Sequence, residues 1–121
     1  MPKTPARHYR ELAVWQKAMD LVIEAYRLAS QLPRVELYAL ASQVRRAAVS
    51  VPANVAEGNG RHRGEYAHHV SIARGSLLEL ETLLHLAVRL DYLEDANVRR
   101  AWALCDEVSR MLLSLSRALA R

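Results

Sequence analysis

YAHHVSIARGSLLELETLLHLA, residues 66–87, is the stretch that decides the fold class. Steps of three and four residues place side chains on one face of an α-helix, which has 3.6 residues per turn. Apolar or aromatic residues recur here in such steps: Tyr66, Val70, Ala73, Leu77, Leu80, Leu84 and Ala87. Leu83, Leu86 and Leu90 widen the same face. The pattern predicts an amphipathic helix over residues 64–90.

The preceding segment, residues 36–57, follows the same spacing with Leu37, Leu40, Val44, Ala48, Val51 and Val55. Pro52 lies inside it and has no N–H to donate to the carbonyl of Ala48. Either the chain breaks and Ser50 caps a new helix, or one helix continues through a bend. Because the apolar positions stay on one face across the proline, we expect one helix with a kink at Pro52.

Two glycines have different predicted roles. Gly58 follows the last apolar position of the second helix, where glycine commonly ends a helix. Gly75 lies inside the third helix, where glycine costs up to about 1 kcal/mol relative to alanine. We therefore expect Gly75 to allow the close approach of another helix.

Two further segments complete the pattern. Residues 10–31 carry Leu12, Trp15, Met19, Val22, Tyr26 and Ala29. Residues 96–120 carry Val98, Trp102, Cys105, Val108, Leu112, Leu115 and Leu119, with Asp95 or Asn97 as the N-cap. Since short connections make consecutive helices antiparallel, we expect an all-α fold. It would be an up-down-up-down four-helix bundle, forming one domain over residues 1–121.

The composition agrees with this fold class and limits the function. Hydrophobic residues make up 51% of the chain, phenylalanine is absent, and glycine and proline number four each, which favours helices over strands. A single cysteine, Cys105, cannot form an internal disulfide. No stretch resembles a signal peptide or a membrane span, so we expect a cytoplasmic protein with no membrane partner. The formal charge of +4 permits a nucleic-acid partner, but an arginine-rich composition alone also explains it.

A polar stripe runs along the second predicted helix, formed by Gln43, Arg46, Ser50, Asn54 and Glu57. Its mean direction lies about 140° from the apolar face at 100° per residue. Such a stripe is either a solvated face or a packed polar contact. Small neighbours such as Ala47 and Ala53 favour a contact with another subunit. These five residues are the candidate oligomer interface.

Four stretches carry a family resemblance: RELAVWQKAMDLV (10–22), LYALASQVRRAAVSVPANVAEGNGR (37–61), EYAHHVSIARGSLLELETLL (65–84) and RLDYL (89–93). They resemble the four-helix-bundle family of 23S rRNA intervening-sequence (S23) proteins. More distantly, the chain is similar to the accessory protein of diversity-generating retroelements. The resemblance implies an antiparallel bundle that assembles into a ring, commonly a homopentamer. It also implies no catalytic residue.

Three positions depart from the family pattern. Ala39 and Asp91 stand where members often have glycine. The third helix begins after Arg61-His62-Arg63-Gly64 rather than after a serine cap. These departures leave the start of that helix and the turn before Tyr92 open.

Catalytic and metal sites find little support in the sequence. A di-iron bundle needs paired Glu-x-x-His motifs, and only Glu65–His68 has that spacing. Glu57-Gly-Asn-Gly-Arg61 lacks the spacing and the strand context of a phosphate-binding loop. We therefore expect no enzyme activity, no metal and no cofactor.

Basic residues are the remaining candidates, as a nucleic-acid surface formed by Arg45, Arg61, His62, Arg63 and Arg74. Oligomerisation would repeat this surface and add avidity for phosphates. The alternative for Arg46 is a pairing with Glu57 or with another subunit. We expect a homo-oligomeric scaffold or adaptor that binds rRNA or other nucleic acid. The alternative is a module that holds a protein partner without nucleic acid.

Overall fold

A computed structural model of the protein describes residues 8–121. It has four α-helices: α1 (Ala13–Ala29), α2 (Leu40–Asn59), α3 (Arg63–Arg89) and α4 (Asp95–Ala120). Two 3₁₀ turns, η1 (Tyr9–Glu11) and η2 (Arg34–Glu36), precede α1 and α2. Residues 8–121 contain no strand. The prediction of an all-α protein with four helices is confirmed.

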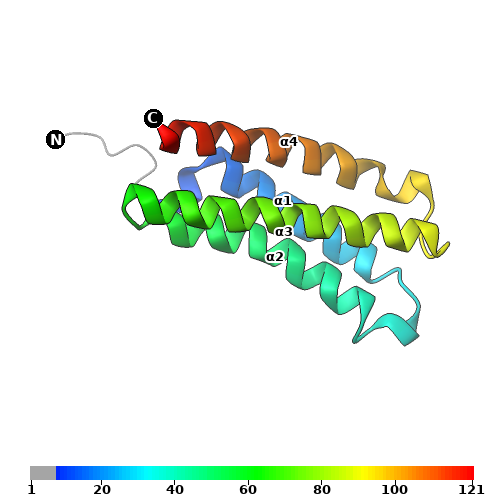
Figure 1. Ribbon diagram of the computed structural model, residues 1–121. Helices are drawn as coiled ribbons and strands as arrows, with labels where there is room; N and C mark the ends of the chain where they lie inside the picture. Colours follow the sequence, from blue (N-terminus) through cyan, green and yellow to red (C-terminus); the bar gives the residue numbers. More distant parts are fainter. Residues whose placement is uncertain (1–7) are drawn as a thin grey trace.

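The helices lie side by side along a common axis (Figure 1). The chain colours run from left to right in α1 and α3 and from right to left in α2 and α4. Helix α2 packs against α1 and α3, and α4 packs against the same two helices. The bundle therefore has α2 and α4 on opposite sides, each in contact with both other helices.

The apolar faces predicted for residues 36–57, 64–90 and 96–120 supply most of the buried core, which includes Val44, Val51, Leu80, Leu84 and Leu112. Helix α1 differs, because its core face is formed by Val14, Ala18, Leu21, Ala25 and Leu28. The apolar stripe that the sequence predicted as the buried face lies mostly on the flank of α1. There Met19 is 37% and Tyr26 46% exposed. Helix α1 is apolar over a wider arc than the bundle interior covers.

The connection from α1 to α2 is longer than expected. The second helix begins at Leu40 rather than at residue 36, because Arg34–Glu36 form the turn η2. One carboxylate oxygen of Glu36 accepts a hydrogen bond from the Leu40 N–H at 3.2 Å. The other accepts one from the Tyr92 hydroxyl at 2.9 Å, so Glu36 joins both connections at this end of the bundle.

Helix α2 continues without interruption through Pro52. The alternative of a break with Ser50 as N-cap is therefore wrong. The Ser50 hydroxyl instead contacts α3. The kink at Pro52 stays a prediction.

Neither interior glycine has its predicted role. Gly58 does not end α2, which continues to Asn59. A Cβ atom added at Gly58 would lie 2.8 Å from the Cβ of His69 and 2.9 Å from Cδ1 of Tyr66, so Gly58 is what lets α3 approach. At Gly75, by contrast, no atom of a neighbouring element in residues 8–121 lies within 4 Å of the added Cβ.

The starts of the last two helices depend on residues that the sequence pattern did not select. His62 caps α3, because its Nδ1 accepts a hydrogen bond from the Glu65 N–H at 3.4 Å. The N-cap of α4 is Glu94, whose N–H donates to Oδ1 of Asn97 at 2.8 Å. Asp91, between the two helices, has a φ of 63°. This left-handed backbone explains why glycine suits the position.

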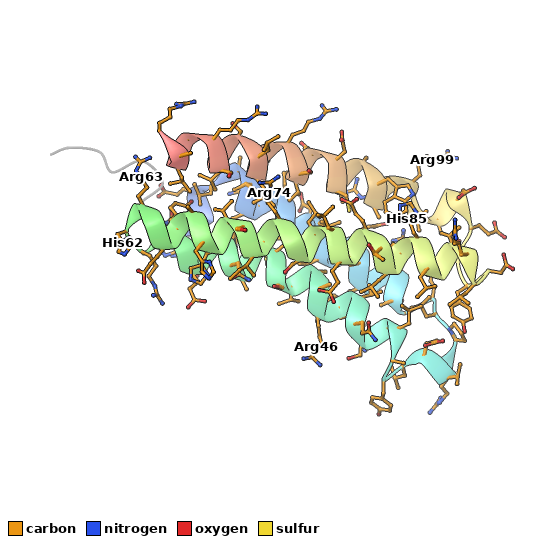
Figure 2. All side chains as sticks on the ribbon, in the orientation of Figure 1. Arg46, His62, Arg63, Arg74, His85 and Arg99 are labelled. Atoms are coloured by element: carbon orange, nitrogen blue, oxygen red, sulfur yellow. The ribbon has the colours of Figure 1, made fainter. Side chains whose placement is uncertain are left out.

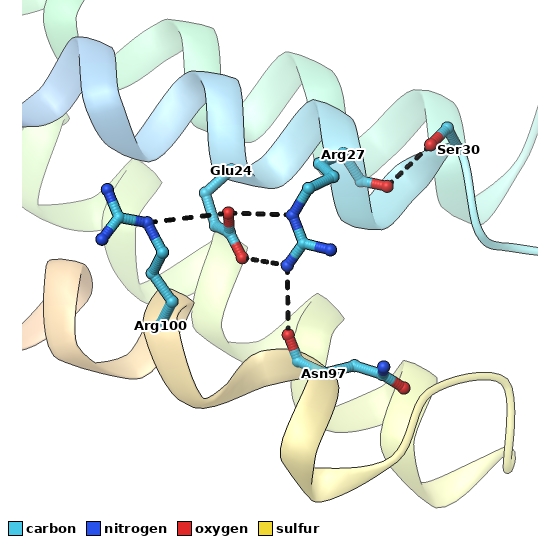
Figure 3. A network of polar contacts seen from close by, with 5 residues as sticks. All are labelled: Glu24, Arg27, Ser30, Asn97 and Arg100. Atoms are coloured by element: carbon cyan, nitrogen blue, oxygen red, sulfur yellow. Dashed lines mark hydrogen bonds and ion pairs between the residues drawn. The ribbon is translucent and has the colours of Figure 1, made fainter.

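A buried carboxylate joins α1 to α4 (Figure 3). The side chain of Glu24 is only 6% exposed and accepts two hydrogen bonds from Arg27, one of them 3.1 Å long. Nε of Arg100 lies 3.9 Å from the same carboxylate, and Arg27 also donates to the carbonyl oxygen of Asn97 at 3.4 Å. The hydrogen bond and the charge of Glu24 raise the pKa of Arg27. Glu24 thereby holds the start of α4 against α1.

Candidate functional site

The polar stripe of α2 divides between two environments. Ser50 and Asn54 lie in the seam between α2 and α3, where the hydroxyls of Ser50 and Ser76 are 2.7 Å apart. The Asn54 amide donates to the Ser50 carbonyl at 2.9 Å, and its oxygen lies 3.0 Å from Nδ1 of His69. The other three members, Gln43, Arg46 and Glu57, are exposed. Ser50 and Asn54 therefore contribute to packing within one chain.

A hollow of about 360 Å³ opens beside this seam. It is lined by Gln43, Arg46, Ala47, Ser50, Ser76 and Glu79. None of the ion pairs among residues 8–121 involves Arg46, and Glu57 pairs with Arg61. Arg46 therefore remains available to a partner.

The five predicted nucleic-acid residues do not form one patch. Figure 2 shows His62 and Arg63 at one end of the bundle and Arg74 in the middle of α3. Arg45 precedes Arg61 by sixteen positions, about 24 Å at 1.5 Å per helical residue. The structure thus groups Arg61, His62 and Arg63 and separates Arg45 and Arg74 from them.

Of Arg61, His62 and Arg63, the first two lie against carboxylates. Arg61 lies 3.2 Å from Glu57 and 3.8 Å from Glu65, and His62 lies 3.5 Å from Glu65. Arg63 donates to the carbonyl oxygen of Ala118 at 2.9 Å. The connection between α2 and α3 is therefore a weaker phosphate-binding surface than its sequence indicates.

An apolar groove between α1 and α2 is a feature that the sequence reasoning missed. We call it the apolar groove; its volume is about 510 Å³ and its lining is Tyr9, Trp15, Met19, Val49, Pro52, Ala53, Ala56 and Glu57. Next to it on α1, Ile23 is 68% exposed. The signal was present in the apolar stripe predicted for residues 10–31, of which Met19 and Tyr26 stay outside the bundle core.

The chain matches the family model described as 23S rRNA-intervening sequence protein over residues 10–114. It belongs to this family. The match confirms the resemblance and extends it from residue 93 into α4. Among curated proteins, none matches the chain.

The two long stretches that carry the family resemblance meet at the α2–α3 seam. Ser50 and Asn54 come from the stretch over residues 37–61. Ser76 and His69 come from the stretch over residues 65–84. In this member of the intervening-sequence family, some of the residues in these two stretches form hydrogen bonds with each other across the seam.

Catalytic chemistry gains no support from the described residues. Burial, and then the charge of Glu81, raise the pKa of the Cys105 thiol to about 12, so the thiol is a poor nucleophile. His85 stacks on Trp102 with 4.3 Å between ring centres. Within residues 8–121, no three His, Cys, Asp or Glu side chains converge as metal ligands. In the same range, no helix is both long and apolar enough to span a bilayer.

Proposed function

We propose that this intervening-sequence family member is a non-enzymatic scaffold or adaptor. It assembles with copies of itself and binds RNA or DNA through basic side chains. The observation that supports assembly is the apolar groove, since a large exposed apolar patch commonly marks an interaction surface. Glu57, an exposed member of the polar stripe, lines this groove and would form part of its polar rim. The family resemblance implies a closed ring of five chains.

Light scattering after size exclusion tests the assembly. We expect a mass well above the 13.7 kDa of one chain for the wild type. A Met19→Glu/Val49→Glu variant should have a lower mass at unchanged helix content, because two charges in the groove oppose apolar contact. Leu78→Glu, at an exposed position of α3 away from the groove, is the control and should keep the wild-type mass. A groove variant of unchanged mass would contradict the proposal.

The net charge of +4 and the arginines outside the ion pairs among residues 8–121 support binding to nucleic acid. Fluorescence anisotropy with labelled rRNA fragments should give an affinity that falls steeply as salt rises, since phosphate contacts release counterions. The absence of binding at low salt would remove this part of the proposal.

The apolar groove also favours a second function, the binding of a helix from a protein partner. In that case a protein would co-purify with the chain after nuclease treatment. It would be lost from the Met19→Glu/Val49→Glu variant but kept by Leu78→Glu. A nucleic-acid adaptor would instead lose its co-purified material to the nuclease.

A further inference from the structure

Three arginines in the α1–α2 connection and on the following part of α2 stand outside the ion pairs of the described residues, although Arg46 lines one hollow together with Glu79. Arg34, Arg45 and Arg46 take part in none of the ion pairs among residues 8–121. Glu36 is the only acidic residue between positions 25 and 56, and both of its oxygens accept hydrogen bonds. The α1–α2 connection and the following part of α2 therefore carry more positive than negative charge, while Asp91, Glu94 and Asp95 lie in the other connection at this end.

Two hollows adjoin at Arg45, and we call them together the arginine groove. The first, of about 470 Å³, is lined by Arg34 and Arg45 with mostly apolar walls: Ala29, Ser30, Leu32, Pro33, Leu37 and Ala41. The second, of about 440 Å³, is lined by Tyr26, Ser42, Arg45, Arg46, Val49 and Ser50. Arg45 lines both hollows and so stands between Arg34 in the first and Arg46 in the second.

The Arg45 side chain is held in place between the hollows. Its Nη2 donates to the Leu37 carbonyl oxygen at 3.4 Å, and its guanidinium carbon lies 5.9 Å from the centre of the Tyr26 ring. Contact with an aromatic face orients a guanidinium without neutralising it. Arg45 is thus oriented and still charged.

Two side chains of the same connection as Arg34 are almost fully exposed. Tyr38 is 91% exposed and Val35 is 81% exposed, and neither contributes to the core. Tyr38 directly follows Leu37, which lines the first hollow. Single-stranded bases stack on exposed aromatic rings while arginines neutralise their phosphates, and this part of the chain supplies both kinds of side chain.

We infer that the arginine groove binds single-stranded nucleic acid. A base stacks on Tyr38, and successive phosphates contact Arg34, Arg45 and Arg46. A duplex keeps its bases stacked on one another, so it offers the groove phosphates but no base for Tyr38. This inference rests on the nucleic-acid part of the proposed function. It moves the site from the α2–α3 connection, where Arg61 is paired with carboxylates, towards the opposite end of α2.

Anisotropy with a labelled oligouridine and with a duplex of equal length tests the inference. Tyr38→Ala should weaken oligouridine binding roughly ten-fold, as expected for the loss of one stacked base, with little effect on the duplex. Tyr38→Phe keeps a ring and should bind as the wild type does. Arg34→Gln/Arg46→Gln should make the dependence of log K on log salt shallower by about 0.7 per lost phosphate contact. Arg61→Gln/Arg63→Gln removes the same charge at the other end of α2. It should change neither the affinity for oligouridine nor the salt dependence of log K.

Several outcomes would overturn the arginine groove. The inference is wrong if Arg61→Gln/Arg63→Gln weakens binding more than Arg34→Gln/Arg46→Gln does. It is also wrong if Tyr38→Ala binds oligouridine as tightly as the wild type. In both cases the proposed function stands. Displacement of oligouridine by polyglutamate at equal charge would indicate a site for acidic proteins instead. A lower mass of Tyr38→Ala in light scattering would make Tyr38 a contact between copies. If the wild type binds no nucleic acid at low salt, both the groove and that part of the proposed function fail.

Discussion

Gly58 and Gly75 have the same chemistry, and both lie inside helices, but their surroundings differ completely. Gly58 faces the Cβ of His69 and the ring of Tyr66 across the α2–α3 contact. Gly75 faces open space within residues 8–121 of one chain. The effect of a side chain is therefore decided by the α2–α3 contact at Gly58 and by helix propensity alone at Gly75.

We predict opposite effects of alanine at these two positions. Gly58→Ala should lower the free energy of unfolding by about 1–3 kcal/mol, because atoms at 2.8 and 2.9 Å must move apart. Gly75→Ala should raise it by up to about 1 kcal/mol through helix propensity. Urea unfolding followed by circular dichroism measures both. Equal stability of the two variants would contradict this packing, and a Gly75→Ala variant with a reduced mass would place another copy against Gly75.

At the scale of elements, one carboxylate joins the two connections at the same end of the bundle. Glu36 accepts hydrogen bonds from the start of α2 and from Tyr92 before α4. The hydrogen bond to Glu36, then burial and the charge of Glu36, raise the pKa of Tyr92 above its ordinary value of 10.0. The folded chain therefore keeps a proton at Tyr92 that the unfolded chain releases more readily.

This raised pKa predicts a stability that depends on alkaline pH. The contribution of Tyr92 is complete below pH 10 and is lost as the pH rises through the raised value in the folded chain. Tyr92→Phe should be less stable than the wild type at neutral pH, and its stability should fall less steeply above pH 10. Some decline should persist, because burial also raises the pKa of Tyr66. Parallel curves of unfolding free energy against pH would contradict a hydrogen bond between Tyr92 and Glu36.

At the scale of the whole molecule, the reactivity of the Cys105 thiol measures how often the four helices separate. Cys105 is 2% exposed in the core, and its pKa is raised to about 12 by burial and then by the charge of Glu81. Reaction with a thiol reagent therefore requires the helices to separate.

We predict that Cys105 is labelled only as fast as the bundle opens. The labelling rate at mildly alkaline pH should rise with urea in step with unfolding. In a Cys105→Ala background, Ser109→Cys places a thiol on the exposed side of α4 and should react at once without urea. Equally fast labelling of the two proteins would mean that Cys105 is accessible in the folded state.

The four helices could be predicted from the sequence because a helical face is a local property. The spacing of Val70, Leu77 and Leu84 alone indicates which side of α3 is buried. The start of α2 could not be predicted in this way, since it depends on how η2 places the carboxylate of Glu36. The core face of α1 was equally ambiguous, because that helix carries two apolar stripes and only its neighbours select one.

The candidate site was less predictable than the fold, for a related reason. Charge counts identified Arg61 and Arg63, but Glu57, Glu65 and the Ala118 carbonyl engage them in the folded chain. Arg34 has no special signal in the sequence and becomes a candidate only when it shares a hollow with Arg45. Periodicity within twenty residues determines helices and their apolar faces. Tertiary structure decides which glycine is crowded and which arginine stays free, because both depend on atoms that are distant in the sequence.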